Sequence, residues 1–168
     1  IMCAFDWSET FYRDCARKKL YEAIDILEKS ARAIDFKNIH EVLTKNIYEQ
    51  NISGLVSKLE AIIRSDFGPK LLHSAKAKDL LSIINEKSCL YLGLSTQGYG
   101  ETALAIGRML LGELLYLSYY FLGPGKRRDL KPVAIYFDEF GGLVTPNFIE
   151  LLNKCRGAKM ELTMAVQS

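Results

Sequence analysis

Apolar residues recur every three or four positions through the first third of the chain, with charged residues between them. Leu20, Ile24 and Leu27 form one such series, and a second series follows Ser53, which is placed to cap a helix. A repeat near 3.6 residues is that of an amphipathic helix with one buried face. We therefore predict a helical, all-α domain over residues 1–75.

From Asp79 onward the pattern changes, and short apolar runs alternate with longer helical stretches. Strands separated by helices are typical of a parallel α/β sheet. The unbroken apolar character of "VAIYF" favours a strand that is covered on both faces. We expect three strands, at Ser88–Leu94, at Val133–Phe137 and in the run that ends at Gln167, and two helices, at Thr102–Phe121 and 146–155.

Composition narrows the choice of function only slightly. The net charge of +2 does not by itself indicate nucleic-acid binding, and four scattered cysteines with two histidines do not form a zinc motif. The most apolar run, Met109–Leu122, is too short for a membrane span and carries Glu113, so we interpret it as a buried helix. The N-terminus lacks the order of a signal peptide. The chain as given is expected to be soluble.

The strand "VAIYF" leads directly into two adjacent carboxylates, Asp138 and Glu139. An apolar strand that ends in Asp-Glu is the Walker B pattern of P-loop nucleotidases, and ligands of parallel sheets bind beyond the carboxyl ends of the strands. Asp138 would hold Mg²⁺ on the nucleotide phosphates, and Glu139 would polarise the attacking water. The alternative is an acidic pair that only ends a strand in solvent.

Two further polar residues follow in the order that such a site requires. Gln167 ends the last apolar run, where its amide could bind the γ-phosphate or the attacking water. Arg156 lies in the turn that ends a helix, from which it could reach a neighbouring subunit's nucleotide as an arginine finger. Taken singly, Gln167 could be a surface amide and Arg156 a helix-terminal charge that the helix dipole favours.

The last 36 residues, "VAIYFDEFGGLVTPNFIELLNKCRGAKMELTMAVQS", resemble the core of the type IV secretion coupling proteins, the TraD/TraG-type conjugation ATPases. The shared pattern is an apolar strand, then DEF, then a helix ending near "NKxRGA", then an apolar strand ending in Gln-Ser or Gln-Thr. "KSCLYLGLSTQGYGETALAIGRMLLGEL" resembles the strand and long helix that precede Walker B in this family. The residues up to about Ser74 resemble the family's all-α insert more loosely.

The resemblance implies a partial RecA-like P-loop NTPase sheet over residues 76–168, preceded by the all-α insert over residues 1–75. It also implies an ATPase that assembles as a homo-hexamer at the cytoplasmic face of the bacterial inner membrane. That motor would use ATP and Mg²⁺ to deliver DNA, relaxosome or effector-protein substrates to the components of a secretion channel. By position, the metal and cofactor ligand is Asp138, the catalytic acid Glu139, the γ-phosphate sensor Gln167 and the candidate finger Arg156.

One part of this site is missing from the sequence. No GxxxxGK[ST] motif occurs, and "GPGKRRD" at Gly123 has neither the spacing nor the following Ser or Thr. We therefore interpret the chain as an internal fragment without the P-loop strand, inactive as an ATPase by itself. In a RecA-like sheet we expect that strand between the Walker B strand and the next one, so both should have unpaired edges.

Two other interpretations stay open from the sequence. The chain could belong to another ring-forming DNA translocase ATPase of the same superfamily. It could instead be a non-catalytic helical adaptor that carries the acids as surface charges. A P-loop upstream of Ile1 would favour a motor, and its absence from the complete gene would favour an adaptor.

Overall fold

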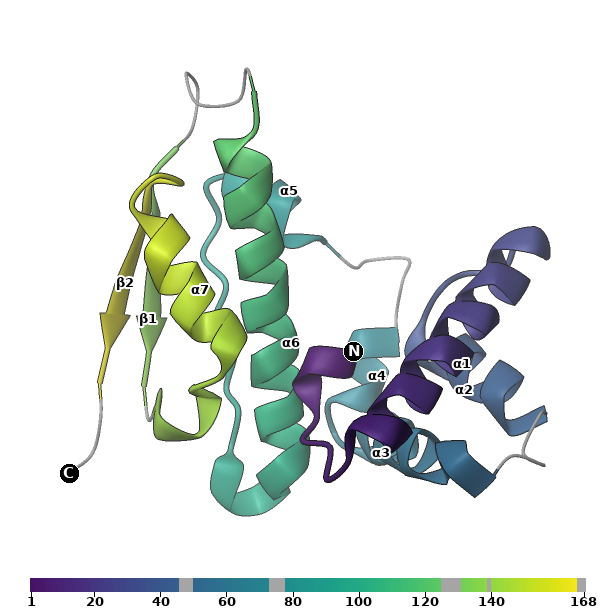
Figure 1. Ribbon diagram of the computed structural model, residues 1–168. Coiled ribbons are helices and arrows are strands. Elements are labelled where there is room, and N and C mark those ends of the chain that lie inside the picture. Colours follow the sequence, from purple (N-terminus) through teal and green to yellow (C-terminus); the bar gives the residue numbers. More distant parts are fainter. Residues whose placement is uncertain (46–49, 73–77, 125–130, 139, 166–168) are drawn as a thin grey trace. The chain divides into compact units, whose positions relative to one another are not determined.

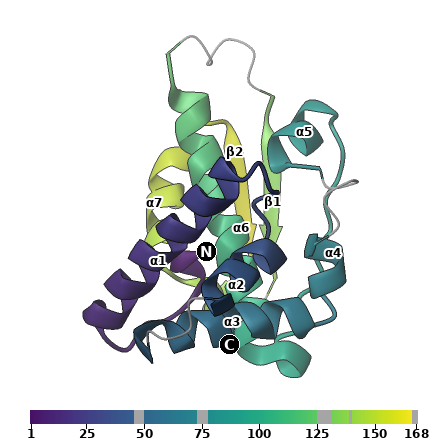
Figure 2. The same ribbon diagram turned by 90° about the vertical axis from the view of Figure 1, so that its right-hand side faces the viewer.

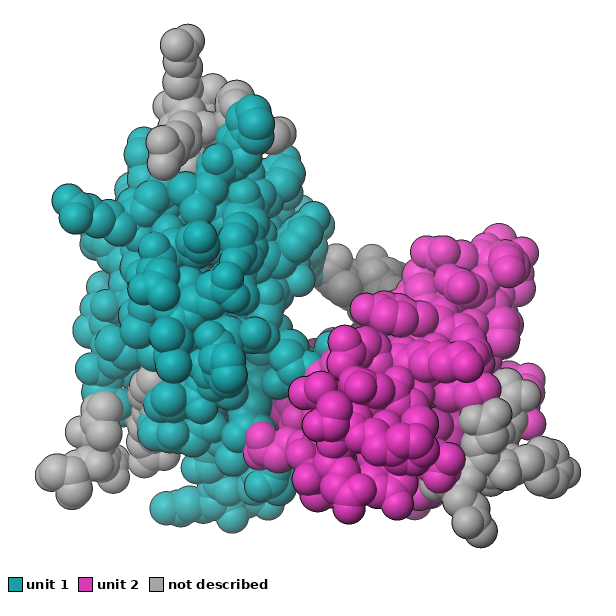
Figure 3. Space-filling view, viewed as in Figure 1, with its two compact units in different colours: residues 1, 3, 78–168 teal, residues 2, 4–77 magenta. Residues whose placement is uncertain are grey.

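The computed structural model has two compact units, each described here by itself (Figure 1). The helical unit comprises residues 2 and 4–77, and the sheet unit comprises residues 1, 3 and 78–168 (Figure 3). The predicted domain boundary at residues 75 and 76 lies outside the described residues. The structure describes residues 1–45, 50–72, 78–124, 131–138 and 140–165.

Four helices make up most of the helical unit: α1 (Thr10–Lys29), α2 (Phe36–Lys45), α3 (Ser53–Arg64) and α4 (Gly68–Leu72). Short 3-10 turns precede two of them, η1 (Met2–Ala4) before α1 and η2 (Gln50–Ile52) before α3. The core consists of the apolar residues that recur at helical spacing, which confirms the periodicity. Buried members are Leu20, Leu27, Ile39, Val42, Leu43, Leu55, Leu59 and Ile62.

The start of α3 differs by one residue from the prediction. Ser53 is the first residue of the helix, and Ile52 takes the N-cap position, from which no side chain caps the helix. The apolar stripe that follows it is nevertheless buried, with Leu55 and Leu59 at 0% exposure. Packing of that stripe therefore decides the helix, and the capping residue is secondary.

The sheet unit contains α5 (Leu80–Asn85), α6 (Thr96–Leu122), β1 (Val133–Phe137), η5 (Phe140–Leu143), α7 (Pro146–Cys155) and β2 (Met160–Met164). β1 and β2 pair directly with each other in parallel, and α7 is the crossover that connects them. The prediction that these two strands would be separated by the position of a missing P-loop strand, each with an unpaired edge there, is therefore wrong. Figures 1 and 2 show α7 and α6 beside the strand pair.

One face of the strand pair is buried against these helices. Side chains of β1 alternate between half-buried and exposed, and Tyr136 on the outer face is 76% exposed. The prediction of a strand covered on both faces is therefore wrong for the described residues. The buried core joins α6, α7 and β2 through Leu111, Leu114, Leu115, Leu117, Phe121, Phe148, Leu151, Ala158 and Met160.

The predicted fold class, a partial RecA-like α/β sheet behind an all-α insert, is contradicted. The chain is mostly helical (66%), and the sheet within the described residues has two parallel strands. The expected strand at Ser88–Leu94 has no regular structure, and Tyr91 within it is 89% exposed. Its apolar residues suit a strand, but a strand also requires a partner edge, and this segment pairs with no strand among the described residues.

The long helix of the sheet unit begins earlier than predicted. α6 runs from Thr96 to Leu122, and the Ser95 side chain caps it by accepting a hydrogen bond from the Gly98 backbone N–H at 3.3 Å. Gly100 interrupts it with φ 45° and ψ −122°, and regular helix resumes after this residue. No helix within the described part of the chain is long and apolar enough to cross a membrane.

Candidate functional site

The two strands end side by side, and this brings the predicted acid to a shared edge. In the register of the sheet Phe137 is the partner of Met164, and the Ala165 backbone N–H donates to the Phe137 carbonyl oxygen at 2.8 Å. Asp138 directly follows Phe137 and is exposed. The chain segments that follow β1 and β2 therefore leave the sheet at the same carboxyl-end edge.

Two of the four predicted site residues cannot be assigned a position. Glu139 and Gln167 lie outside the described residues. Their neighbours in sequence, Asp138 and Ala165, do lie at the shared edge. The predicted meeting of the catalytic acid with the sensor amide thus stays a prediction.

Arg156 lies at the opposite end of the strand pair, near the amino ends of β1 and β2. It follows the last residue of α7, is exposed, and accepts a backbone hydrogen bond from Lys159 at 3.4 Å. Lys159 in turn accepts from Val133, the first residue of β1. Strands of this length place the two ends of the pair about 13 Å apart, at about 3.3 Å per residue. The structure does not bring Arg156 and Asp138 of one chain together.

Three packing features hold the segment that follows Asp138. The ring of Phe137 meets the ring of Phe148 edge to face, with centroids 6.3 Å apart, and so ties the end of β1 to α7. The Thr145 hydroxyl caps α7 by accepting from the Phe148 N–H at 3.4 Å, and Pro146 occupies the first turn. η5 packs against α6 by placing Leu143 over Gly107.

The donor set at this edge is compatible with a metal ion that arrives bound to a nucleotide. Among the residues that the structure describes, no three His, Cys, Asp or Glu side chains form a group that could hold a metal ion. Mg²⁺ keeps several waters and usually takes one or two carboxylates besides phosphate oxygens. Asp138 can supply one such carboxylate, and Glu139 follows it in sequence.

Among the described residues, hydrogen bonds shift the pKa values of four groups, all away from this edge: they lower those of Glu22, Glu41 and Asp79 and raise that of Tyr119. Lys45 and Arg32 donate to Glu41 at 2.6 and 2.7 Å, and they lower the pKa of that carboxyl from 4.5 to about 2. The Tyr119 hydroxyl on α6 donates to the Glu150 carboxylate on α7, which raises the pKa of Tyr119. The Glu41 cluster ties the α1–α2 loop to α2, and the hydrogen bond of Tyr119 joins α6 to α7.

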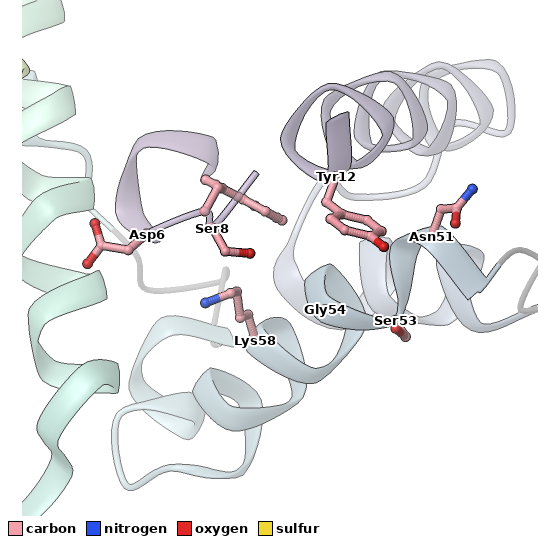
Figure 4. Close-up of a pocket in the computed structure, with 8 residues that line it drawn as sticks. Asp6, Ser8, Tyr12, Asn51, Ser53, Gly54 and Lys58 are labelled. Atoms are coloured by element: carbon pink, nitrogen blue, oxygen red, sulfur yellow. The ribbon is translucent and has the colours of Figure 1, made fainter. Parts of the chain in front are cut away.

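The helical unit also has a small pocket that no sequence pattern indicated (Figure 4). It is lined by the segment before α1, the first turn of α1 and the start of α3, with Ser8, Tyr12, Asn51 and Lys58 among its polar side chains. Ser8 and Tyr12 lie about 40–50 positions before Asn51 and Lys58 in the sequence, and no periodic pattern connects the two groups. The one sequence signal was Trp7, the single tryptophan of the chain, in a segment of mixed polarity.

Comparison of this chain with known protein families, with curated proteins and with solved structures found no match.

Proposed function

We propose that this chain carries the metal-binding and water-activating acids of an ATPase motor. The observation that supports the proposal is the parallel, in-register pairing of β1 with β2. Because of this pairing, the segments that begin with Asp138 and Ala165 leave the sheet at one edge. Carboxylates and an amide that belong to these two segments are suited to act on one bound nucleotide.

Each residue has a distinct role in this proposal. Asp138 binds the Mg²⁺ that bridges the nucleotide phosphates, and Glu139 accepts a proton from the attacking water. Gln167 donates to the γ-phosphate or orients that water. The phosphates themselves are gripped by residues outside these 168, because the sequence contains no GxxxxGK[ST] motif.

Arg156 acts on a nucleotide bound to a different subunit. Its place at the opposite end of the strand pair from Asp138 puts it out of reach of a phosphate held at Asp138 of the same chain. An arginine supplied by a neighbouring subunit stabilises the charge that develops on the transferred phosphoryl group. This role requires an oligomer, for which we propose a homo-hexameric ring.

The proposed motor delivers DNA or protein substrates to a type IV secretion or conjugation channel at the bacterial inner membrane. The support is the resemblance of residues 133–168 to the coupling proteins, above all the "DEF" and "NKxRGA" segments. Another ring-forming DNA translocase would use the same acids. Deleting the complete gene and measuring substrate transfer separates the two. Loss of transfer indicates a coupling protein, and unchanged transfer indicates another translocase.

The test uses the complete protein encoded by the gene. Glu139→Gln should leave binding of MgATP within about threefold of the unchanged protein and reduce hydrolysis at least about 10³-fold, because the amide cannot accept the proton. Glu161→Gln is the matched control, since Glu161 is an exposed acid in β2. Unchanged hydrolysis by Glu139→Gln would contradict the role of Glu139 as the water-activating acid. If the complete protein fails to bind MgATP, the result favours the non-catalytic helical adaptor.

A further inference from the structure

We propose that the pocket of the helical unit binds a small anionic molecule through Lys58. The pocket has a volume of about 350 Å³, within the range of small-molecule sites. All its residues belong to the helical unit, so it is separate from the edge that carries Asp138. The inference does not depend on the proposed ATPase function.

Lys58 is held by aromatic rings instead of by a carboxylate. Its ammonium nitrogen lies 5.1 Å from the centroid of the Phe5 ring and 5.8 Å from that of Trp7, both within the range of a cation–π interaction. No acid within the described residues forms an ion pair with it. Three other cations of this unit do form ion pairs: Arg17, Lys45 and Arg64 each lie 2.6 Å from a carboxylate oxygen.

A lysine in this setting keeps its positive charge available to a ligand. The two ring faces attract the charge of the ammonium group but do not take up its three N–H donors as oxygen acceptors would. The Trp7 indole N–H donates to the Met2 carbonyl oxygen at 3.2 Å, which orients one of the two rings. The ammonium group is therefore positioned at the pocket, and within the part of the chain that the structure describes it has no carboxylate as an ion-pair partner.

Most of the other polar groups of the pocket are neutral and can donate hydrogen bonds to an anion. Ser8, Tyr12 and Asn51 contribute two hydroxyls and an amide, and Figure 4 shows Tyr12 above the start of α3. The same figure shows the Asp6 carboxylate turned away from Tyr12 and Asn51. The start of α3 also lines the pocket, and the positive end of its helix dipole adds to the field of the lysine.

Space for the ligand lies over the first turn of α3. Apart from its chain neighbours and the backbone of its own helix, no heavy atom comes within 4 Å of the position that a Cβ atom on Gly54 would occupy. Lys58 follows Gly54 by four residues, so both lie on the same side of the helix. The chemistry is that of a site for one carboxylate or phosphate group, and its volume limits the ligand to a small molecule.

The single tryptophan of the chain provides the readout. Trp7 fluorescence of the 168-residue chain is followed during titration with inorganic phosphate and, separately, with succinate, with ionic strength held constant by sodium chloride. We expect saturation with at least one of the two anions. Tighter binding of phosphate identifies a phosphate-bearing ligand, and tighter binding of succinate identifies a carboxylate.

Substitutions decide whether Lys58 carries the binding. Lys58→Met should weaken binding at least about tenfold, because a charge-assisted hydrogen bond is lost, and Lys58→Arg should retain it. Lys37→Met, on α2 and outside the pocket, is the control. Gly54→Leu fills the space and leaves Lys58 in place, so it should also abolish saturation while circular dichroism remains unchanged.

Two results would overturn the site. One is the absence of any saturable change in Trp7 fluorescence with either anion. The other is the same dissociation constant in Lys58→Met, in Gly54→Leu and in the Lys37→Met control. Since the fluorescence assay uses no ATP, its outcome is distinguishable from the outcome of the hydrolysis test above.

Discussion

Leu143 packs directly over Gly107: a Cβ atom on Gly107 would lie 2.7 Å from Leu143 Cδ2. Gly107 is buried within α6, and Leu143 ends η5, which follows the acidic pair. This contact fixes the segment after β1 against α6. A larger residue at position 107 should therefore overpack the contact, and a smaller residue at 143 should relieve it.

Gly107→Val should destabilise the sheet unit by about 1–3 kcal/mol, the usual cost of an overpacked core. Leu143→Ala combined with Gly107→Val should recover on the order of 1 kcal/mol relative to additive costs. Urea denaturation of the four proteins of this double-mutant cycle measures the coupling. Strictly additive losses would show that Leu143 does not occupy the space over Gly107.

Two glycines of the helical unit, Gly54 and Gly68, should respond in opposite directions to substitution by alanine. A Cβ atom on Gly68 would lie 2.0 Å from the Ile63 carbonyl oxygen, which belongs to the backbone and cannot turn aside. Gly68→Ala should cost about 1–3 kcal/mol or more. Gly54→Ala meets no atom within 4 Å and should stabilise the unit by up to about 1 kcal/mol.

The measurement for these two variants is the midpoint of urea denaturation, followed by far-ultraviolet circular dichroism. Both substitutions add the same single methyl group to a helical glycine. Their difference therefore reports the local space and not the residue type. Equal shifts of the two midpoints in the same direction would contradict the close approach at Gly68.

The Glu41 cluster should make the stability of the helical unit depend on acid pH. The folded pKa of Glu41 is lowered from 4.5 to about 2, so its contribution is present above pH 4.5 and is lost as the pH falls toward 2. Glu41→Gln should reduce the pH dependence of the free energy of unfolding over that window. Added salt should weaken the same dependence in the unchanged chain, because the ion pairs are exposed.

Urea denaturation at a series of pH values tests this prediction. Glu28→Gln is the control, since Glu28 is an exposed acid that makes no ion pair within the described residues. The pH profile of that control should match the profile of the unchanged chain. A Glu41→Gln profile that also matches it would remove the cluster with Arg32 and Lys45 from the acid response.

The outer face of the strand pair should promote self-association. Tyr136 is 76% exposed there, and exposed apolar groups beside an unpaired strand edge favour intermolecular contacts. Tyr136→Lys should reduce aggregation of the 168-residue chain, measured by light scattering against concentration. Tyr116→Lys, at a tyrosine 63% exposed on α6, is the control and should have the smaller effect. Equal effects would argue for general hydrophobicity.

The 168-residue chain is expected to show no magnesium-dependent ATP hydrolysis by itself. The reason is that its sequence lacks the glycine-rich loop and lysine that bind the β- and γ-phosphates. Phosphate release is measured with the complete protein as the positive control. Sustained turnover by the 168-residue chain would show that the phosphates are bound in some other way.

Local patterns predicted the local structure well. The 3.6-residue repeat places Leu20, Leu27 and Leu59 on buried helix faces, because one apolar stripe can be covered by neighbouring helices in many arrangements. The helix at 146–155 was also predicted at its observed bounds, and in the structure Thr145 caps it and Pro146 begins it. These features depend on residues near one another in the chain.

Long-range features were predicted poorly. The apolar run at Ser88–Leu94 suggested a strand, but strand formation depends on a partner edge that the run itself does not specify. The predicted fold class was wrong for the same reason, because the number and pairing of strands in a sheet depend on distant segments. The pocket at Lys58 was missed because its two sides are joined only by folding.

The sequence by itself determined the helical repeat of residues 1–75, the helix at 146–155, the apolar strand before Asp138 and the absence of a phosphate-binding motif, all of which are encoded in short windows. Only the tertiary structure decided that β1 and β2 pair directly, that Asp138 and Arg156 lie at opposite ends of the strand pair, and that Lys58 lies over Phe5 and Trp7. These relationships depend on hydrogen bonds and packing between distant segments, and a local pattern of polarity does not specify the partner of each segment.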